Sequence, residues 1–196
     1  MAIIHQAVIT PSKLDVIEQW LDQQPWGGSG PLEQLGSYRF DDPDGEVGIE
    51  AILVRRGDAA LQAALTYRSA ALDGADDHLI ATIDHSVLGR RWVYDAAADP
   101  VAARCFERSL TGAQQQAELE VWAGGRVVGH REPTVTLSVV DVEEGDDSGL
   151  AESTGASAPA VGTAVRIART LGNRLSGQRR LVATWAGGAA TVAALE

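Results

Sequence analysis

The sequence predicts an α+β fold: a curved antiparallel sheet with a helix packed across it, a second helix and additional strands. Two observations favour it. A β-branched segment and a helical segment come first in the chain, and a succession of short strand-like segments follows them. The connections between those segments are of hairpin length, and parallel strands need longer crossovers. The sequence therefore predicts antiparallel pairing and disfavours a parallel nucleotide-binding sheet.

The first helix is expected directly after a strand formed by the apolar stretch at 2–10. Thr10 is the expected N-cap and Pro11 suits the first helical position. The helix should end near Gln24, before Pro25 and the glycines that follow. Its predicted apolar face consists of Leu14, Ile17, Trp20 and Leu21.

Turn residues mark the boundaries of the further predicted elements. Residues 35–70 should hold three strands separated by Asp-Gly and Arg-Gly-Asp turns. Residues 76–95 read as one long strand, or as a strand broken at Gly89. A second helix should begin at Asp99 as N-cap with Pro100 next, and it carries Val101, Cys105, Phe106 and Leu110 on one face. Two or three more strands are expected between 117 and 142.

We expect three parts in the chain. Residues 1–140 should form a cap-like α+β domain, and residues 161–196 a C-terminal strand pair that returns to it. Residues 141–160 contain six acids and no base, with few bulky apolar side chains. Such a composition buries too little apolar surface to offset the entropy of ordering, so it predicts a flexible acidic linker.

Composition excludes several classes of partner. The formal net charge is -11, and no run of lysine or arginine exceeds two residues. Binding to nucleic acid or to an anionic membrane is therefore not expected. Cys105 is the single cysteine, so no internal disulfide can form, and no apolar run approaches a membrane span. We expect a cytoplasmic protein.

The motifs of common enzyme chemistries are missing from the sequence. It has no glycine-rich phosphate loop and no GxSxG elbow, and its four histidines lack metal-ligand spacing. Cys105 falls on the apolar face of a predicted helix, where a thiol is an inert core residue. We therefore expect no catalytic residues, no metal site and no cofactor.

One stretch concentrates polar and aromatic side chains, "HSVLGRRWVYDAAADP" at 85–100. Two interpretations stay open for it. It is either the structural seam between a strand and the second helix, or a surface that binds a ligand or partner. The candidate residues on it are His85, Arg90, Arg91, Trp92, Tyr94 and Asp95.

Three segments carry a resemblance to a known family: "AIIHQAVITPSKLDVIEQWL", "GSYRFDDPDGEVGIEAILVRRGD" and the stretch from 65 to 101. Together they resemble the N-terminal cap domain of actinobacterial maltokinases, and more closely the stand-alone cap-like proteins, often labelled α-glucan branching proteins. The resemblance implies a cystatin-like fold and a domain that sits on a phosphotransferase lobe without supplying catalytic residues. It also matches Trp26, Gly27 and Gly28 to a cap motif, which makes Trp26 a further candidate.

The resemblance leads to three hypotheses of function. The first is a non-catalytic accessory protein of α-glucan, trehalose or maltose-phosphate metabolism that binds a sugar kinase or related enzyme. The second is a module that binds an oligosaccharide through Trp92, Tyr94 and Arg91. The third is an α-glucan branching activity, although branching enzymes normally rest on a barrel of roughly 250 residues, which this chain cannot contain.

Overall fold

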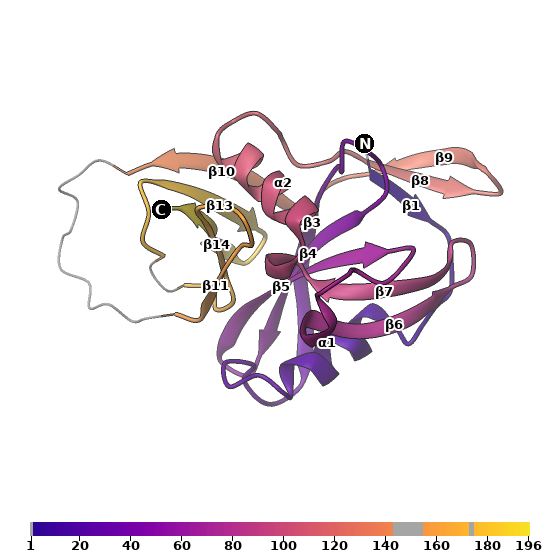
Figure 1. Ribbon diagram of the computed structural model, residues 1–196, viewed down its shortest axis with the longest axis horizontal. Helices are drawn as coiled ribbons and strands as arrows, with labels where there is room; N and C mark the ends of the chain where they lie inside the picture. Colours follow the sequence, from indigo (N-terminus) through magenta and orange to yellow (C-terminus); the bar gives the residue numbers. More distant parts are fainter. Residues whose placement is uncertain (1, 143–154, 173–174) are drawn as a thin grey trace.

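The computed structural model describes residues 2–142, 155–172 and 175–196, and β-strands are its main regular structure (Figure 1). The helices are α1 (Lys13–Leu21) and α2 (Pro100–Leu110), with short 3₁₀ turns at η1 (Asp76–His78) and η2 (Ala96–Ala98). The strands are β1 (Ala2–His5), β2 (Ile9–Thr10), β3 (Leu32–Phe40), β4 (Gly48–Arg56), β5 (Ala59–Arg68), β6 (Leu79–His85), β7 (Gly89–Asp95), β8 (Leu119–Ala123), β9 (Arg126–Arg131), β10 (Val135–Asp141), β11 (Ser157–Pro159), β12 (Val165–Ala168), β13 (Arg179–Trp185) and β14 (Gly188–Leu195). The predicted α+β class is confirmed.

A six-stranded antiparallel sheet forms the centre of the molecule, in the order β2-β6-β7-β5-β4-β3. Both of its faces are covered by other elements. Alternate residues of a strand point to opposite sides, so each strand contributes to two cores. On β4, Ile52 and Val54 pack with the apolar face of α1. Ala51 and Leu53 on the same strand pack instead with α2 and the second sheet. Consecutive residues of the central strands are therefore buried, whereas a strand with one face in water would alternate buried and exposed residues.

The second sheet is antiparallel and has five strands, in the order β10-β13-β14-β12-β11. It shares one apolar core with α2 and the central sheet. The side chain of Gln62 fastens the two sheets together at this core. Its Nε2 donates to the carbonyls of Ala168 and Val192, each at 3.0 Å, and its Oε1 accepts from the Tyr38 hydroxyl at 2.8 Å.

A third sheet of three strands, β1-β8-β9, extends away from the other two (Figure 1). Here β1 runs parallel to β8. The single strand expected at 2–10 is therefore wrong, because β1 and β2 belong to different sheets. The chain leaves one sheet after His5 and joins the edge of the other at Ile9, where β2 pairs with β6.

The start of α1 differs from the prediction. The N-cap is Ser12, whose hydroxyl accepts from the backbone N–H of Asp15 at 3.2 Å. The Asp15 carboxylate in turn accepts from the N–H of Ser12, and this reciprocal pair fixes the helix start two residues after Thr10. Pro11 lies outside the helix and follows a cis peptide bond.

The other predicted helix features have mixed outcomes. The helix α1 ends at Leu21, three residues before Gln24, and Val16 is buried in the core in place of the exposed Leu14. The start of α2 is confirmed, because the Asp99 side chain accepts from the N–H of Val101 and Pro100 follows the cap. Its predicted apolar face is confirmed too. Cys105, Phe106 and Leu110 are buried, and Val101 is partly buried.

Residues 79–95 form a hairpin, so the prediction of one long strand is wrong. The alternative of a strand broken at Gly89 is correct about the break, but it did not include the reversal of the chain. The turn lies between β6 and β7, and Gly89 opens β7 with φ +73°, which suits glycine. Because strand propensity is the same on both sides of Gly89, periodicity alone could not reveal the chain reversal.

The C-terminal region holds three strands, β12 to β14, and not the predicted pair. Residues 143–154 of the predicted linker lie outside the described residues. Its end is ordered, since β11 pairs with β12 and Ala160 is buried. The division of the chain at residues 140 and 160 stays a prediction.

Candidate binding site

The candidate residues of 85–95 lie on the β6–β7 hairpin, and they alternate between the two faces of the central sheet. Val93 packs in the core beneath α1, so Arg91 and Asp95 on the same strand share that face. Arg90, Trp92 and Tyr94 belong to the opposite face. The stretch that looked like one cluster in the sequence is therefore divided between two surfaces.

His85 closes the turn of the hairpin. Its Nδ1 accepts from the backbone N–H groups of Val87 at 3.2 Å and Leu88 at 3.1 Å. The ring of His5 meets it edge-on, with centroids 5.8 Å apart. Burial, and then the charges of His5 and Arg91, lower the pKa of His85 from its ordinary value. A neutral His85 keeps Nδ1 free to accept both bonds, so its visible role is to hold the turn.

Exposed apolar side chains surround this turn. We call Val8, Ser86, Val87, Leu88 and Arg90 the hairpin tip. Val8 is joined to it because its N–H donates to Ser86 Oγ at 3.0 Å and its carbonyl accepts from Ser86 N–H at 2.9 Å. Val8 is 70% exposed, Val87 57% and Leu88 43%. Three such neighbours in contact with water are typical of an interaction surface.

Arg90 of the hairpin tip and its neighbour Arg91 are held only weakly. Arg90 Nε lies 3.6 Å from Asp84 Oδ1, and both side chains are largely exposed. Such surface pairs contribute little to stability. Arg91 donates to the carbonyl of Arg90 at 3.2 Å. Both guanidinium groups can therefore reorient, each from its own face of β7.

At the opposite end of β7 the residues are interior. Tyr94 is fully buried, and its hydroxyl accepts from the N–H of Leu72 at 2.9 Å. Its ring cannot form the face of an exposed platform, and it shares no face with Arg91. Trp92 is half-buried. Asp95 caps η2 by accepting from the N–H of Ala97 at 3.0 Å, and its second oxygen pairs with Arg169.

The pair between Asp95 and Arg169 lies in the wall of a pocket of about 310 Å³, the Arg169 pocket. The Arg169 guanidinium lies over two tryptophan rings, 5.5 Å from the centroid of Trp20 and 5.7 Å from that of Trp26. The two rings meet edge to face with centroids 5.4 Å apart. The remaining lining residues are Gln23, Gln24, Asp77, His78, Leu79, Ile80, Ser157 and Ala158.

Glycines after α1 place Trp26 in this wall. A Cβ on Gly27 would lie 1.9 Å from the carbonyl oxygen of Leu21, so only glycine lets the loop close against the end of the helix. Gly28 has φ +69°, which also favours glycine. The Trp-Gly-Gly motif thus has a local cause: it folds the loop back and sets Trp26 against Trp20.

Sequence reasoning missed most of the pocket. It singled out Trp26 and Asp95 but not Arg169, which is 3% exposed and lies 74 residues from Asp95 along the chain. Trp20 was expected only as a core residue. The sequence signal was weak: "VRIART" holds two arginines among apolar residues, and a buried arginine needs an acidic partner. The partner itself could not be read from spacing.

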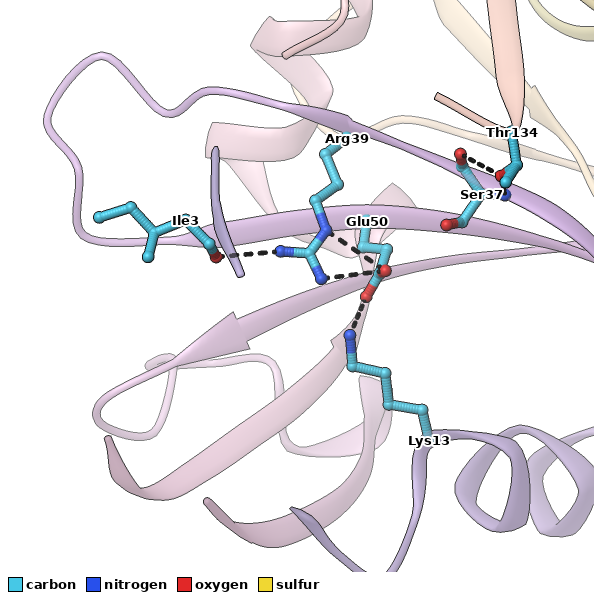
Figure 2. A network of polar contacts seen from close by, with 6 residues as sticks. All are labelled: Ile3, Lys13, Ser37, Arg39, Glu50 and Thr134. Carbon is cyan, nitrogen blue, oxygen red and sulfur yellow. Dashed lines mark hydrogen bonds and ion pairs between the residues drawn. The ribbon is translucent and has the colours of Figure 1, made fainter. Parts of the chain in front are cut away.

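A second buried ionic group lies under the other end of α1 (Figure 2). Lys13, the only lysine, pairs with one oxygen of Glu50, and Arg39 pairs with the other at 3.1 Å. Arg39 also donates to the carbonyl of Ile3 at 3.4 Å. Burial alone would raise the pKa of Glu50, but the two cations hold it at about 2. This cluster joins α1, the central sheet and β1.

Little in the described residues suggests metal or thiol chemistry. No three His, Cys, Asp or Glu side chains of residues 2–142, 155–172 and 175–196 gather as metal ligands. Cys105 is buried, and burial raises the pKa of its thiol, which keeps it protonated and unreactive. In the same ranges no helix has the length and apolar character to span a membrane.

Comparison with known proteins identifies one segment. No curated protein and no solved structure gives a significant match to the chain. Residues 20–99 match the model of the maltokinase N-terminal cap domain family. This segment runs from Trp20 to Asp99 and includes the Trp26 loop, the hairpin tip apart from Val8, and Asp95. Residues 20–99, which we call the cap-like segment, are therefore similar to the N-terminal cap domain of maltokinases.

Proposed function

We propose that this protein is a non-catalytic accessory module of α-glucan, trehalose or maltose-phosphate metabolism that binds a sugar kinase in the cytoplasm. The observation that carries the proposal is the family match of residues 20–99, since the family is named for a domain at the N-terminus of a kinase. The arrangement of α1 across a curved antiparallel sheet supports a cystatin-like cap. The sequence also has no phosphate-binding loop with which to transfer phosphate itself.

The hairpin tip is the surface that we assign to the partner. It combines exposed Val8, Val87 and Leu88 with the weakly held Arg90, and Arg91 follows directly. Apolar side chains supply area for burial, while arginine adds planar charge that pairs well with carboxylates. Because the whole chain carries a net charge of -11, a local basic tip favours one orientation of approach for an acidic partner.

The other two hypotheses receive less support. A platform of Trp92, Tyr94 and Arg91 would need one shared face, and these residues lie on two faces with Tyr94 buried. The described residues form three sheets and two helices, and these do not include the barrel on which the fold of branching enzymes is normally built. We therefore keep the accessory role as the proposed function.

The test is a calorimetric titration of a full-length maltokinase with this protein and with the Arg90→Ala, Arg91→Ala double variant. The double variant should bind at least about fivefold more weakly and show a smaller salt dependence. The control is Arg104→Ala with Arg126→Ala, which removes the same charge from exposed sites on α2 and β9. Absence of binding by the wild type, or equal weakening by the control, would contradict the proposal.

A further inference from the structure

We propose that the Arg169 pocket binds a neutral saccharide of one or two rings. This inference does not depend on kinase binding, because the pocket and the hairpin tip share no residues. Its volume of about 310 Å³ lies at the lower end of the range for small-molecule sites. A ligand of that size fits, and a long glucan chain does not fit inside.

The lining suits a polyol. Gln23 and Gln24 each offer an amide donor and an acceptor, and Asp77 and Ser157 add further oxygens. Sugar hydroxyls both donate and accept, so each can use such a mixed set. Trp26 provides an apolar wall against which the C–H side of a sugar ring can lie, because tryptophan combines a large apolar surface with a polar edge.

The charges of the pocket separate neutral sugars from ionic ligands. The positive charge of Arg169 is already paired with Asp95. Asp77 also lines the pocket, and its carboxylate pairs with no cation among the described residues. A phosphate ester would meet that carboxylate and is disfavoured. A cationic ligand would normally seek the tryptophan rings, but the Arg169 guanidinium already lies over both of them.

Arg169 adds an independent sign of a ligand. Its Nη1 is buried and has no hydrogen-bond partner among the residues that the structure describes. Buried donors of this kind are rare, because leaving one unpaired is costly. Since the side chain forms part of the pocket wall, a small adjustment on binding lets Nη1 donate to a sugar hydroxyl.

The pocket also joins two regions of the chain. Trp26, Asp77 and Asp95 come from the cap-like segment, whereas Ser157 and Arg169 come from the strands at the C-terminal end. A saccharide held between them binds only when both regions are in place. Occupancy therefore stabilises the folded chain by mass action.

The experiment is calorimetric titration of the intact protein with glucose, maltose, trehalose and glucose 1-phosphate. We expect saturable binding of at least one neutral sugar, and weakening by about tenfold or more for Trp26→Ala. Glucose 1-phosphate should bind more weakly than glucose. The matched control is Trp122→Ala, a half-buried tryptophan on β8 outside the pocket, which should change affinity by less than about twofold.

A second variant covers the case in which Trp26→Ala lowers stability. Gln23→Ala removes an exposed lining side chain and should weaken binding without moving the unfolding temperature. The proposal is overturned if no neutral sugar binds up to about 20 mM, if glucose 1-phosphate binds more tightly than glucose, or if Trp122→Ala is as damaging as Trp26→Ala. Each of these results leaves the maltokinase titration unaffected, so the two proposals fail separately.

Discussion

Arg169 and Asp95 form an ion pair that ties the loop after β12 to the end of β7. The guanidinium side chain is only 3% exposed and is covered by two tryptophan rings. One oxygen of Asp95 serves the pair while the other caps η2. The same contact therefore links the cap-like segment to the C-terminal sheet and shapes the wall of the pocket.

Replacing Arg169 should be costly. Arg169→Met leaves Asp95 without its cation and should lower the free energy of unfolding by about 3 kcal/mol, as measured by urea denaturation. The Arg169→Met, Asp95→Asn double variant also removes the unpaired charge of Asp95. It should therefore recover part of the lost free energy of unfolding. Fully additive losses in this cycle would show that the two side chains act independently.

The Trp26 loop should not tolerate a larger residue at position 27. Gly27→Ala places a Cβ 1.9 Å from the Leu21 carbonyl, so the loop must move, and we expect destabilisation of about 2 kcal/mol in thermal unfolding. Gly129→Ala is the control, because a Cβ there meets nothing within 4 Å. Equal stability of the two variants would contradict the close packing of loop and helix.

Acid should weaken the cluster at Glu50. Because Lys13 and Arg39 hold its pKa at about 2, below the usual 4.5, the stabilisation is complete above pH 4.5 and is lost as pH falls toward 2. Unfolding free energies of wild type and Glu50→Gln should differ by about 3 kcal/mol at pH 7, and this difference should shrink between pH 4.5 and 2. A difference that is independent of pH would refute the charged role of Glu50.

Gln62 should be essential for the contact between the two large sheets. Gln62→Ala deletes its three hydrogen bonds in a fully buried position and removes the side-chain donor to the carbonyls of Ala168 and Val192. We expect a loss of about 3 kcal/mol in denaturant unfolding. Gln115→Ala, at an exposed position on the loop after α2, is the control. An equal loss of stability in the two variants would contradict the role of Gln62 in joining the sheets.

The sequence predicted those features whose causes are local. Asp99 and Pro100 marked the start of α2 because an N-cap and the first helical position are set by neighbouring residues. The start of α1 was misplaced because both Thr10 and Ser12 can cap, and the capping box with Asp15 decides in favour of Ser12. Local patterns were therefore sufficient only where a single candidate was present.

Long-range relationships could not be predicted in this way. The alternation of β7 divides Arg91 from Trp92, and the packing of Val93 with α1 decides which face each of them takes. The Arg169 pocket depends on a residue from the far end of the chain, brought to Trp26 by strand pairing in another sheet. Neither composition nor periodicity contains that information.

Amide hydrogen exchange on this protein, alone and mixed with an excess of maltokinase, tests directly whether the hairpin tip binds the kinase. We expect exchange to slow at residues 86–90, where the hairpin tip becomes covered, while amides of α2 keep their rates. Unchanged exchange throughout the hairpin, or protection confined to other surfaces, would contradict the assignment of the tip as the kinase-binding surface.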